Sequence, residues 1–303
     1  MIRIAALPSG SVSHEALLHI LGDQPIEIVH HKMIADVFLS TAQGKTDYSV
    51  IPIENTIEGS VTLHMDWLVH EVDIPMQLEW VYPSIQNLIG RRSELIADGE
   101  DPSLVSPESD LDYSRIRKVL SHPVAMAQCH QFIRSTLPEA ELEHVGSTAE
   151  AVQMVSQNPG QGLAAIGTSL GAQKYGLDIL ADRITDHDNN HTRFVLIGNR
   201  PITVKKEADH MKTSMLITLS ENFAGALHQV LAAFSWRKLN LSRIESRPTK
   251  KKLGNYYFYI DVLASQDSVL IKAAMEEIQA LGCQVRVLGS YPCYEYNLAR
   301  AKS

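Results

Sequence analysis

The sequence lacks the features that mark membrane, secreted and disulfide-stabilised proteins. No apolar run approaches the ~20 residues that a membrane-spanning helix needs, so we expect no membrane contact. The start of the chain reaches Pro8 and Gly10 without a long apolar core, which predicts no signal peptide. The three cysteines show no C-x-x-C spacing, which favours a reducing cytoplasmic location over a disulfide framework.

Positive charge is also scarce. The 303 residues include 27 Lys and Arg against 35 Asp and Glu, giving a formal net charge of −8. Nucleic-acid binding needs a basic face, so we expect no nucleic-acid partner, although a local basic pocket for a small anion is compatible with this balance. The length suggests about two domains. A hydrophobic content of 45% is enough to build their cores.

Strand and helix patterns alternate through the first half of the chain. Short apolar runs predict strands at 2–7, 26–29 and 48–53, with helices at 14–21 and 33–42 between them. This alternation predicts a largely parallel sheet in an α/β layer. The same patterns continue further along, with strands expected at 74–82, 85–89, 119–120, 142–145 and 163–166, and a helix at 123–133.

Polar side chains gather at four strand-to-helix turns. Ligands in open α/β sheets bind beyond the carboxyl ends of strands, and helix starts offer N–H groups to anions. We therefore expect several of these turns to converge on one anion, while an ordinary capped loop is the alternative at each turn. The side chains concerned are Ser11, Ser13, Asn55, Thr56, Ser60, Ser121, Thr168 and Ser169.

One stretch, residues 189–198, combines a polar loop with an apolar strand. Thr192 and Arg193 lie where the loop enters the strand, and a hydroxyl beside a guanidinium suits an anionic substrate that gains or loses a proton. The alternative is a polar loop leading into an ordinary strand. A P-loop is rejected at 162–169 because Thr168 replaces its Lys. A calcium loop is rejected at 186–197 because His191 replaces its Gly and Ile197 its terminal Glu. His187 and His191 could ligate a transition metal, but a polar surface loop is favoured over this alternative.

A second pattern follows a polar segment, residues 199–212, which we interpret as a linker. Strands are predicted at 215–219, 241–245, 256–263 and 284–288, with helices at 223–239 and 268–281. This is the βαββαβ order of a ferredoxin-like domain. Because it contains no catalytic cluster, a small-molecule sensor is favoured, and a structural spacer is the alternative.

Five stretches stand out in order along the chain. They are Pro8-x-Gly10-Ser11-x-Ser13-His14, Ile51-Pro52-Ile53-Glu54-Asn55-Thr56 through Gly59-Ser60-Val61, Ser121-His122-Pro123 with Gln128-Cys129, Thr192-Arg193-Phe194, and Glu245-Ser246-Arg247-Pro248. Together they resemble the family of monofunctional prephenate dehydratases with a C-terminal ACT regulatory domain. The resemblance covers nearly the whole chain, and Gly225-Ala226-Leu227 resembles the effector loop of ACT domains. Three positions depart from the family pattern: Leu7 replaces a Gly, Val12 an aromatic residue and Ala224 a Pro.

The resemblance implies a fold. The family's catalytic region has two α/β lobes around a cleft, like periplasmic binding proteins, followed by the ferredoxin-like ACT domain. The implied limits are a catalytic region at 1–199 (lobe one 1–80 plus about 181–199, lobe two about 82–180), a linker at 200–212, the ACT domain at 213–290 and a tail at 291–303.

The resemblance also implies a reaction, the decarboxylating dehydration of prephenate to phenylpyruvate in L-phenylalanine biosynthesis. Thr192 would donate or share a proton with the departing hydroxyl, and Arg193 would orient the side-chain carboxylate. Phe194 would pack under the site, and Glu54 would orient its donors. No metal or organic cofactor is implied. The implied substrate donors are Ser11, Asn55, Thr56, Ser60, Gln128, Thr168 and Ser169.

For regulation, the resemblance implies allosteric feedback inhibition by L-phenylalanine in a homodimer or homotetramer. The effector would lie between two chains, against Asn222, Gly225, Ala226 and Leu227 of one and Glu245 and Ser246 of the other. Two alternatives stay open from the sequence: arogenate dehydratase, whose substrate carries an amine in place of the ketone, and a non-catalytic sensor of a small anion on the same fold.

Overall fold

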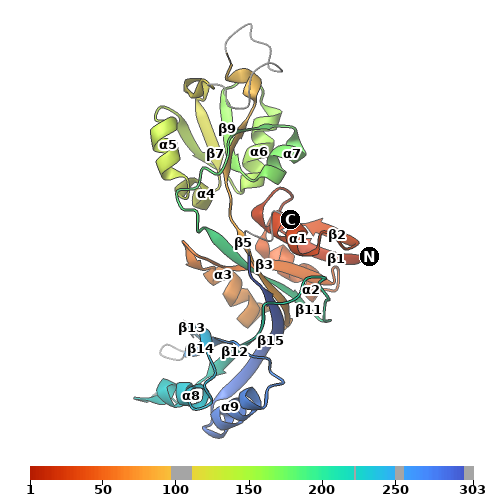
Figure 1. Ribbon diagram of the computed structural model, residues 1–303, viewed down its shortest axis with the longest axis vertical. Helices are drawn as coiled ribbons and strands as arrows, with labels where there is room; N and C mark the ends of the chain where they lie inside the picture. The colour runs from red at the N-terminus through yellow and green to blue at the C-terminus, as the bar shows by residue number, and fades with distance from the viewer. Residues whose placement is uncertain (97–110, 222, 250–255, 297–303) are drawn as a thin grey trace.

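The computed structural model describes residues 1–96, 111–221, 223–249 and 256–296. Three parts follow one another along the long axis of the molecule (Figure 1). Two β-sheets run through them, one of ten strands and one of five. Within the described ranges, no helix is both long and apolar enough to cross a membrane.

The ten-stranded sheet extends through the middle and lower parts of Figure 1. Its strands are β1 (Ile2–Ala6), β2 (Ile26–His30), β3 (Tyr48–Asn55), β4 (Gly59–Ser60), β5 (Met76–Pro83), β11 (His191–Gly198), β12 (His210–Thr218), β13 (Leu241–Pro248), β14 (Tyr256–Val262) and β15 (Gln284–Tyr294). The order is β13-β14-β12-β15-β5-β11-β3-β1-β2, with β4 paired to β3. The helices of the first lobe are α1 (Val12–Leu21), α2 (Ile34–Ala42), α3 (Thr62–Asp66) and the π-helical turn η1 (Trp67–Glu71).

The five-stranded sheet forms the upper part of Figure 1. Its strands are β6 (Asn87–Gly90), β7 (Lys118–Ser121), β8 (Glu141–His144), β9 (Leu163–Gly167) and β10 (Asp178–Ala181), in the order β10-β6-β9-β7-β8. β7 pairs in parallel with β8 and β9. The helices are α4 (Pro123–Ala127), α5 (His130–Thr136), α6 (Thr148–Gln157) and α7 (Ser169–Tyr175), with 3-10 turns η2 (Arg92–Glu94) and η3 (Tyr113–Arg115).

The C-terminal region has the expected βαββαβ order, β12-α8-β13-β14-α9-β15, in which α8 is Ala226–Ser235 and α9 is Val269–Ala280. Its strands form an antiparallel sheet. Apolar residues of its strands and helices form a buried core, including Val230, Phe234, Ile260 and Ile271. The mixed α/β class and the ferredoxin-like domain expected from the sequence are therefore confirmed.

Several element boundaries differ from those expected. Gly59-Ser60 was expected to open a helix but forms β4, because Gly59 adopts a positive φ of 78° that turns the chain back onto β3. The helix expected at 123–133 is two helices, broken at Gln128-Cys129. β12 begins at His210 rather than 215, and β15 continues six residues beyond Leu288, because the two strands pair as far as Cys293 and β5 pairs with the last two residues of β15. A Lys-rich hairpin, which the sequence also predicts at Gly254-Asn255, lies outside the described residues.

The chain crosses twice between the sheets, once after β5 and once before β11. The two crossings are bonded to each other, because the N–H of Ser84 donates to the carbonyl oxygen of Asn190 at 2.8 Å. β5 and β11 are themselves neighbours in the large sheet, paired antiparallel from His191 to Ile197. The polar stretch that precedes β11 is thereby held between the two lobes.

Candidate active site

A cavity of about 640 Å³ opens between the two lobes, at the point where the chain crosses. Its walls include the turn after β1, the β3–β4 loop, the crossing after β5, and the starts of α4 and α6. Seven of the residues predicted from the sequence line it: Ser11, Ser13, Asn55, Ser60, Gln128, Thr192 and Phe194.

Thr192 is the centre of a buried hydrogen-bond cluster in this cavity. Its Oγ1 lies 2.6 Å from the Oγ of Ser84 and accepts a hydrogen bond of 3.0 Å from Nδ2 of Asn55. The orientation of the Asn55 amide is fixed, because its Oδ1 accepts the backbone N–H groups of Ile57 and Glu58. With Asn55 donating to the hydroxyl oxygen, the Thr192 proton is the part of the group that can be donated.

Asn190 connects this cluster to the second lobe. Its Oδ1 accepts from Nδ2 of Asn55 at 2.8 Å, and its own Nδ2 donates to Oε1 of Gln128 at 2.9 Å. Because Oε1 of Gln128 is engaged, the Nε2 donors of Gln128 are the part that can meet a ligand.

Phe194 forms an apolar wall and stacks on Trp80, with ring centroids 5.6 Å apart.

Two helix N-termini from opposite lobes reach the cavity. Ser11 caps α1 by accepting from the N–H of His14 at 3.4 Å, and Ser147 caps α6 by accepting from the N–H of Glu150 at 3.1 Å. Both capping residues line the cavity. The positive ends of the two helix dipoles therefore favour an anionic ligand between the lobes.

Thr168 and Ser169 do not line the cavity, although both were expected to bind substrate. The hydroxyl of Thr168 donates to the carbonyl oxygen of Gly10 at 2.8 Å, and that of Ser169 donates to the Glu15 carboxylate at 3.2 Å. The N–H of Leu170 also donates to Glu15, whose pKa is raised by burial. These side chains hold the start of α7 against the turn after β1, so their role is to join the lobes.

Thr56 is a second correction of the same kind. Its hydroxyl donates to the carbonyl oxygen of Asn189 at 2.6 Å and accepts from the N–H of His191 at 2.9 Å. Thr56 is absent from the cavity wall. Its position shows that it fastens the β3–β4 loop to the start of β11, where it supports Thr192 from outside.

Arg193 points away from the cavity, because successive side chains of a strand face opposite sides of the sheet. Its guanidinium lies 3.1 Å from Glu54, 3.6 Å from Glu79 and 3.8 Å from Asp261. Burial lowers its pKa, but these three carboxylates outweigh burial and raise it above the usual range. Arg193 therefore does not line the cavity, where the sequence analysis expected it to meet a substrate carboxylate.

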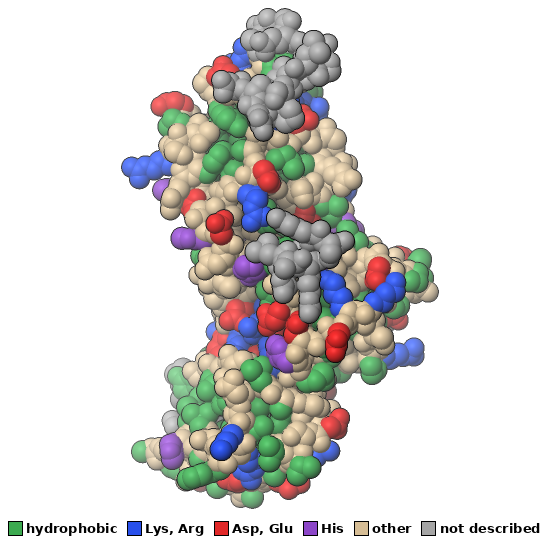
Figure 2. Space-filling view, viewed as in Figure 1, with side chains coloured by type: hydrophobic (Ala, Val, Ile, Leu, Met, Phe, Trp, Pro, Cys, Tyr) green, Lys and Arg blue, Asp and Glu red, His purple; other side chains and the backbone are tan. Residues whose placement is uncertain are grey.

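Arg193, Glu54, Glu79 and Asp261 form a cluster, the Arg193 cluster, where the C-terminal region meets the two lobes. Lys212 pairs with Glu79, and both side chains are almost fully buried. Figure 2 shows acidic and basic side chains gathered at the corresponding junction, between the middle and lower parts of the molecule. The junction is thus held by charge as well as by strand pairing.

Several residues of the cavity wall were missed by the sequence analysis. Gln86 is buried, and its Oε1 has no hydrogen-bond partner among the described residues. The imidazole Nδ1 of His122 accepts from the N–H of Val124, and burial lowers the pKa of His122, which favours a neutral ring with its proton on Nε2. Ser84, Lys32 and Ser147 complete the group. His122 belongs to the Ser121-His122-Pro123 stretch, and the others carry no distinctive sequence signal.

Residues 4–202 match the family model described as prephenate dehydratase. The chain belongs to the prephenate dehydratase family. A second family model, the ACT domain, matches residues 214–281. The family and the regulatory domain inferred from the five sequence stretches are both confirmed.

Known relatives span almost the whole chain. The prephenate dehydratase of Bacillus subtilis is 39% identical over 274 residues, covering 89% of this chain and 91% of that protein. The structure of a prephenate dehydratase from Arthrobacter aurescens in complex with L-Phe has a TM-score of 0.81 at 28% identity, covering 96% of this chain and 90% of that one. A quorum-quenching acylase has a TM-score of 0.77 at 22% identity, covering 98% and 99%, which shows the fold alone. An enzyme is therefore confirmed and favoured over a non-catalytic sensor.

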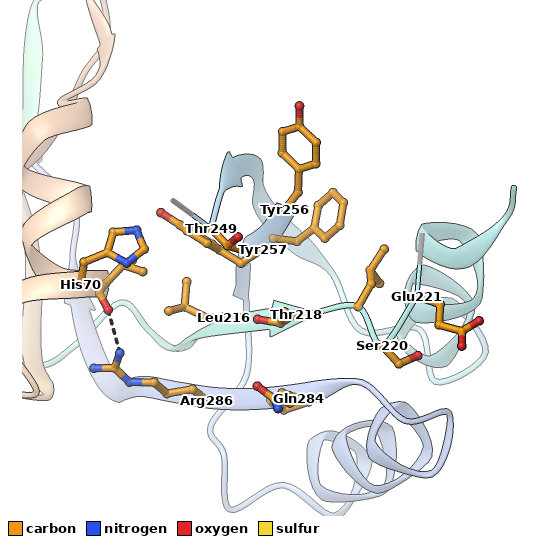
Figure 3. A pocket seen from close by; sticks show the side chains of 14 residues that line it. His70, Leu216, Thr218, Ser220, Glu221, Thr249, Tyr256, Tyr257, Gln284 and Arg286 are labelled. Carbon is orange, nitrogen blue, oxygen red and sulfur yellow. Dashed lines mark hydrogen bonds between the residues drawn. The ribbon is translucent and has the colours of Figure 1, made fainter. Parts of the chain in front are cut away.

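The ACT domain of this family member has a cavity of its own, of about 590 Å³. It lies between η1 and the sheet face formed by β12, β14 and β15, as Figure 3 shows with His70, Tyr257 and Arg286. Arg286 donates to the carbonyl oxygen of Val69 at 2.9 Å across this gap. None of the predicted effector residues that the structure describes lines the cavity.

The predicted effector residues lie in two groups. Gly225 precedes α8 with a positive φ of 93°, Ala226 and Leu227 begin the helix, and Asn222 lies outside the described residues. On β13, Ser246 is exposed, whereas Glu245 accepts from Oγ of Ser60 at 2.7 Å and pairs with Arg243. Glu245 thus contacts a residue of the catalytic cavity in its own chain.

Proposed function

We propose that the protein converts prephenate to phenylpyruvate, with loss of water and carbon dioxide. The observation that carries this proposal is the buried hydroxyl of Thr192, oriented by Asn55 and Ser84 inside a cavity that two helix N-termini make favourable to anions. A buried, oriented hydroxyl can stabilise charge on a departing oxygen far better than water can, because no solvent must reorganise.

The proposed reaction breaks two bonds that join the ring to its substituents. The bond to the ring carboxylate cleaves, its electron pair enters the ring, and carbon dioxide leaves. The bond to the opposite hydroxyl also cleaves, and its electron pair leaves with the oxygen. That oxygen takes one proton to become water. Thr192 donates this hydrogen bond or proton, and Asn55 stabilises the charge that develops on the threonine oxygen. A proton from solvent, passed through the hydroxyl of Ser84, then restores the hydroxyl of Thr192.

The remaining side chains of the cavity bind and enclose the substrate in this proposal. Ser11, Ser60 and Gln128 are donors from the two lobes, and Phe194 supplies an apolar wall for the ring. Arg193 acts through the strand that carries Thr192 and does not touch substrate. We retain residues 1–199 as the catalytic region, 200–212 as a linker that ends in the first residues of β12, and 213–290 as the ACT domain, whose last strand continues to Tyr294.

The direct test is phenylpyruvate formation by the purified protein, followed with prephenate and with arogenate. We expect turnover of prephenate with the higher kcat/KM. Turnover of arogenate alone would replace this proposal with arogenate dehydratase. Tight binding of prephenate without turnover would instead support a sensor of small anions.

We further propose that L-phenylalanine inhibits the enzyme at an ACT interface between two chains of a cytoplasmic homodimer or homotetramer. The complex of the Arthrobacter relative with L-Phe supports the choice of effector. The hydrogen bond from Ser60 to Glu245 supports a short route, because one strand carries both an effector residue and a contact with the cavity wall. Inhibition then requires that phenylalanine favours a state in which this contact differs.

Ser246→Ala is expected to raise the phenylalanine concentration for half-inhibition by about 3- to 10-fold, the effect of losing one ordinary hydrogen bond. Activity without phenylalanine should stay within twofold, because Ser246 is exposed and lies outside the cavity. Ser242 is another exposed serine on β13, so Ser242→Ala is the matched control, and phenylalanine should inhibit this variant as it inhibits the wild type. Equal loss of activity and inhibition in Ser246→Ala would instead indicate a structural role.

A further inference from the structure

The cavity has a shortage of positive charge for the substrate proposed above. Prephenate carries two carboxylates, and a buried carboxylate needs a cation or several N–H donors. Arg193, the cation expected from the sequence, is committed to Glu54, Glu79 and Asp261 on the other face of the sheet. The N-termini of α1 and α6 supply partial charges only.

Among the residues that the structure describes on the cavity wall, Lys32 is the single Lys or Arg. It follows β2, which ends at His30, at the same sheet edge as the turn after β1, because Ala6 and His30 are partners in the parallel register. That turn supplies Ser11 and the N-terminus of α1. Lys32 and this helix start therefore belong to one edge of the cavity.

Lys32 is also available to a ligand. Its side chain is exposed, and it forms no ion pair with a carboxylate of the described ranges. Glu58, on the same cavity wall, is not close enough to form an ion pair with it. An ammonium group on a flexible stem can follow a carboxylate as the lobes close, at the cost of some side-chain entropy.

We propose that Lys32 binds the side-chain carboxylate of prephenate, the one that phenylpyruvate retains; this inference rests on the proposed function. The two carboxylates differ in what a cation does to them. The ring carboxylate loses its charge as it becomes carbon dioxide, so a cation there would stabilise the substrate more than the transition state and slow the reaction. The side-chain carboxylate keeps its charge throughout, so a cation there strengthens binding without opposing the chemistry.

The first test is Lys32→Met, which keeps the length of the stem and removes the charge. We expect KM for prephenate to rise about 10- to 100-fold, the effect of losing a charge-assisted contact. kcat should change less than threefold, because the contact is equally strong in substrate and transition state. Lys45→Met, an exposed lysine just beyond the other end of α2, is the control and should leave both constants within twofold.

Phenylpyruvate identifies which carboxylate Lys32 binds, because this product keeps only the side-chain carboxylate. We expect Lys32→Met to weaken inhibition by phenylpyruvate by the same factor as it raises KM. Lys32→Arg should recover most of the affinity, and KM of Lys32→Met should depend less on salt than KM of the wild type. If Lys32 had only a structural role, KM, inhibition by phenylpyruvate and the salt dependence of KM would not change together in this way.

An unchanged KM in Lys32→Met would overturn the proposal, and so would a raised KM with unchanged inhibition by phenylpyruvate. Failure of the proposed function is a separate result, because it would appear as no turnover of prephenate by the wild type. In that case, calorimetric binding of phenylpyruvate to wild type and Lys32→Met still tests the carboxylate contact. Equal affinities there would reject it.

Discussion

Thr192→Ala is expected to lower kcat for prephenate by about 10²- to 10⁴-fold, which corresponds to roughly 3–5 kcal/mol of barrier. The substitution removes the hydroxyl that faces the departing oxygen and leaves Nδ2 of Asn55 and Oγ of Ser84 without their common partner. KM should change little, because this hydrogen bond strengthens only as the C–O bond breaks.

The measurement is initial-rate formation of phenylpyruvate across a range of prephenate concentrations. Thr192→Ser retains a hydroxyl and should keep far more activity than the alanine variant. Thr203→Ala, an exposed threonine in the segment before the ACT domain, is the control and should behave as the wild type. A well-folded Thr192→Ala variant with unchanged kcat would remove Thr192 from the mechanism.

Arg193→Met is expected to lower the free energy of unfolding by about 3 kcal/mol or more, because it removes one of the cations that neutralise a cluster of buried carboxylates. Glu79 is 3% exposed, and Asp261 is fully buried. Both carboxylates lie near the guanidinium of Arg193, at 3.6 Å and 3.8 Å. KM for prephenate should rise less than threefold, because the guanidinium does not reach the cavity. Urea denaturation followed by circular dichroism measures the first quantity, and initial rates measure the second.

The matched control is Arg3→Met, which removes an arginine from the exposed pair with Glu27. Such pairs contribute roughly 0–1 kcal/mol, so this variant should unfold close to the wild type. A normally stable Arg193→Met protein with a KM raised tenfold or more would contradict our assignment and return Arg193 to the substrate. The pair of measurements thus decides between the role expected from the sequence and the role suggested by the structure.

The fold could be predicted from the sequence because its signals are local. Alternating apolar runs and capped turns identified the strands and helices, and the βαββαβ order needed only their succession. Boundaries that depend on distant partners could not be predicted in this way. β15 is longer than expected because it pairs with the early residues of β12 and, at its end, with β5, and nothing within residues 289–294 announces either partner.

The site was harder to predict, since one residue type serves several purposes. Thr56 and Thr168 have the same hydroxyl as Thr192, but they fasten loops and lobes, and only the three-dimensional register separates these roles. Arg193 was grouped with Thr192 because they are adjacent, although the alternation of a strand turns adjacent residues to opposite faces. A lone Lys32 in a polar turn resembles any surface lysine until the cavity is seen.

The parallel pairing of β15 with β5 has a consequence for any attempt to separate the catalytic region from the regulatory domain. A fragment that ends near residue 202 would expose β5 as a bare edge, which invites aggregation through strand pairing. It would also deprive Glu79 of Lys212, and Arg193 of Asp261, in what had been the protein interior. The regulatory domain is therefore part of the scaffold of the catalytic lobe, and it cannot be exchanged between proteins as a detachable module unless β5 and its charged neighbours are redesigned with it.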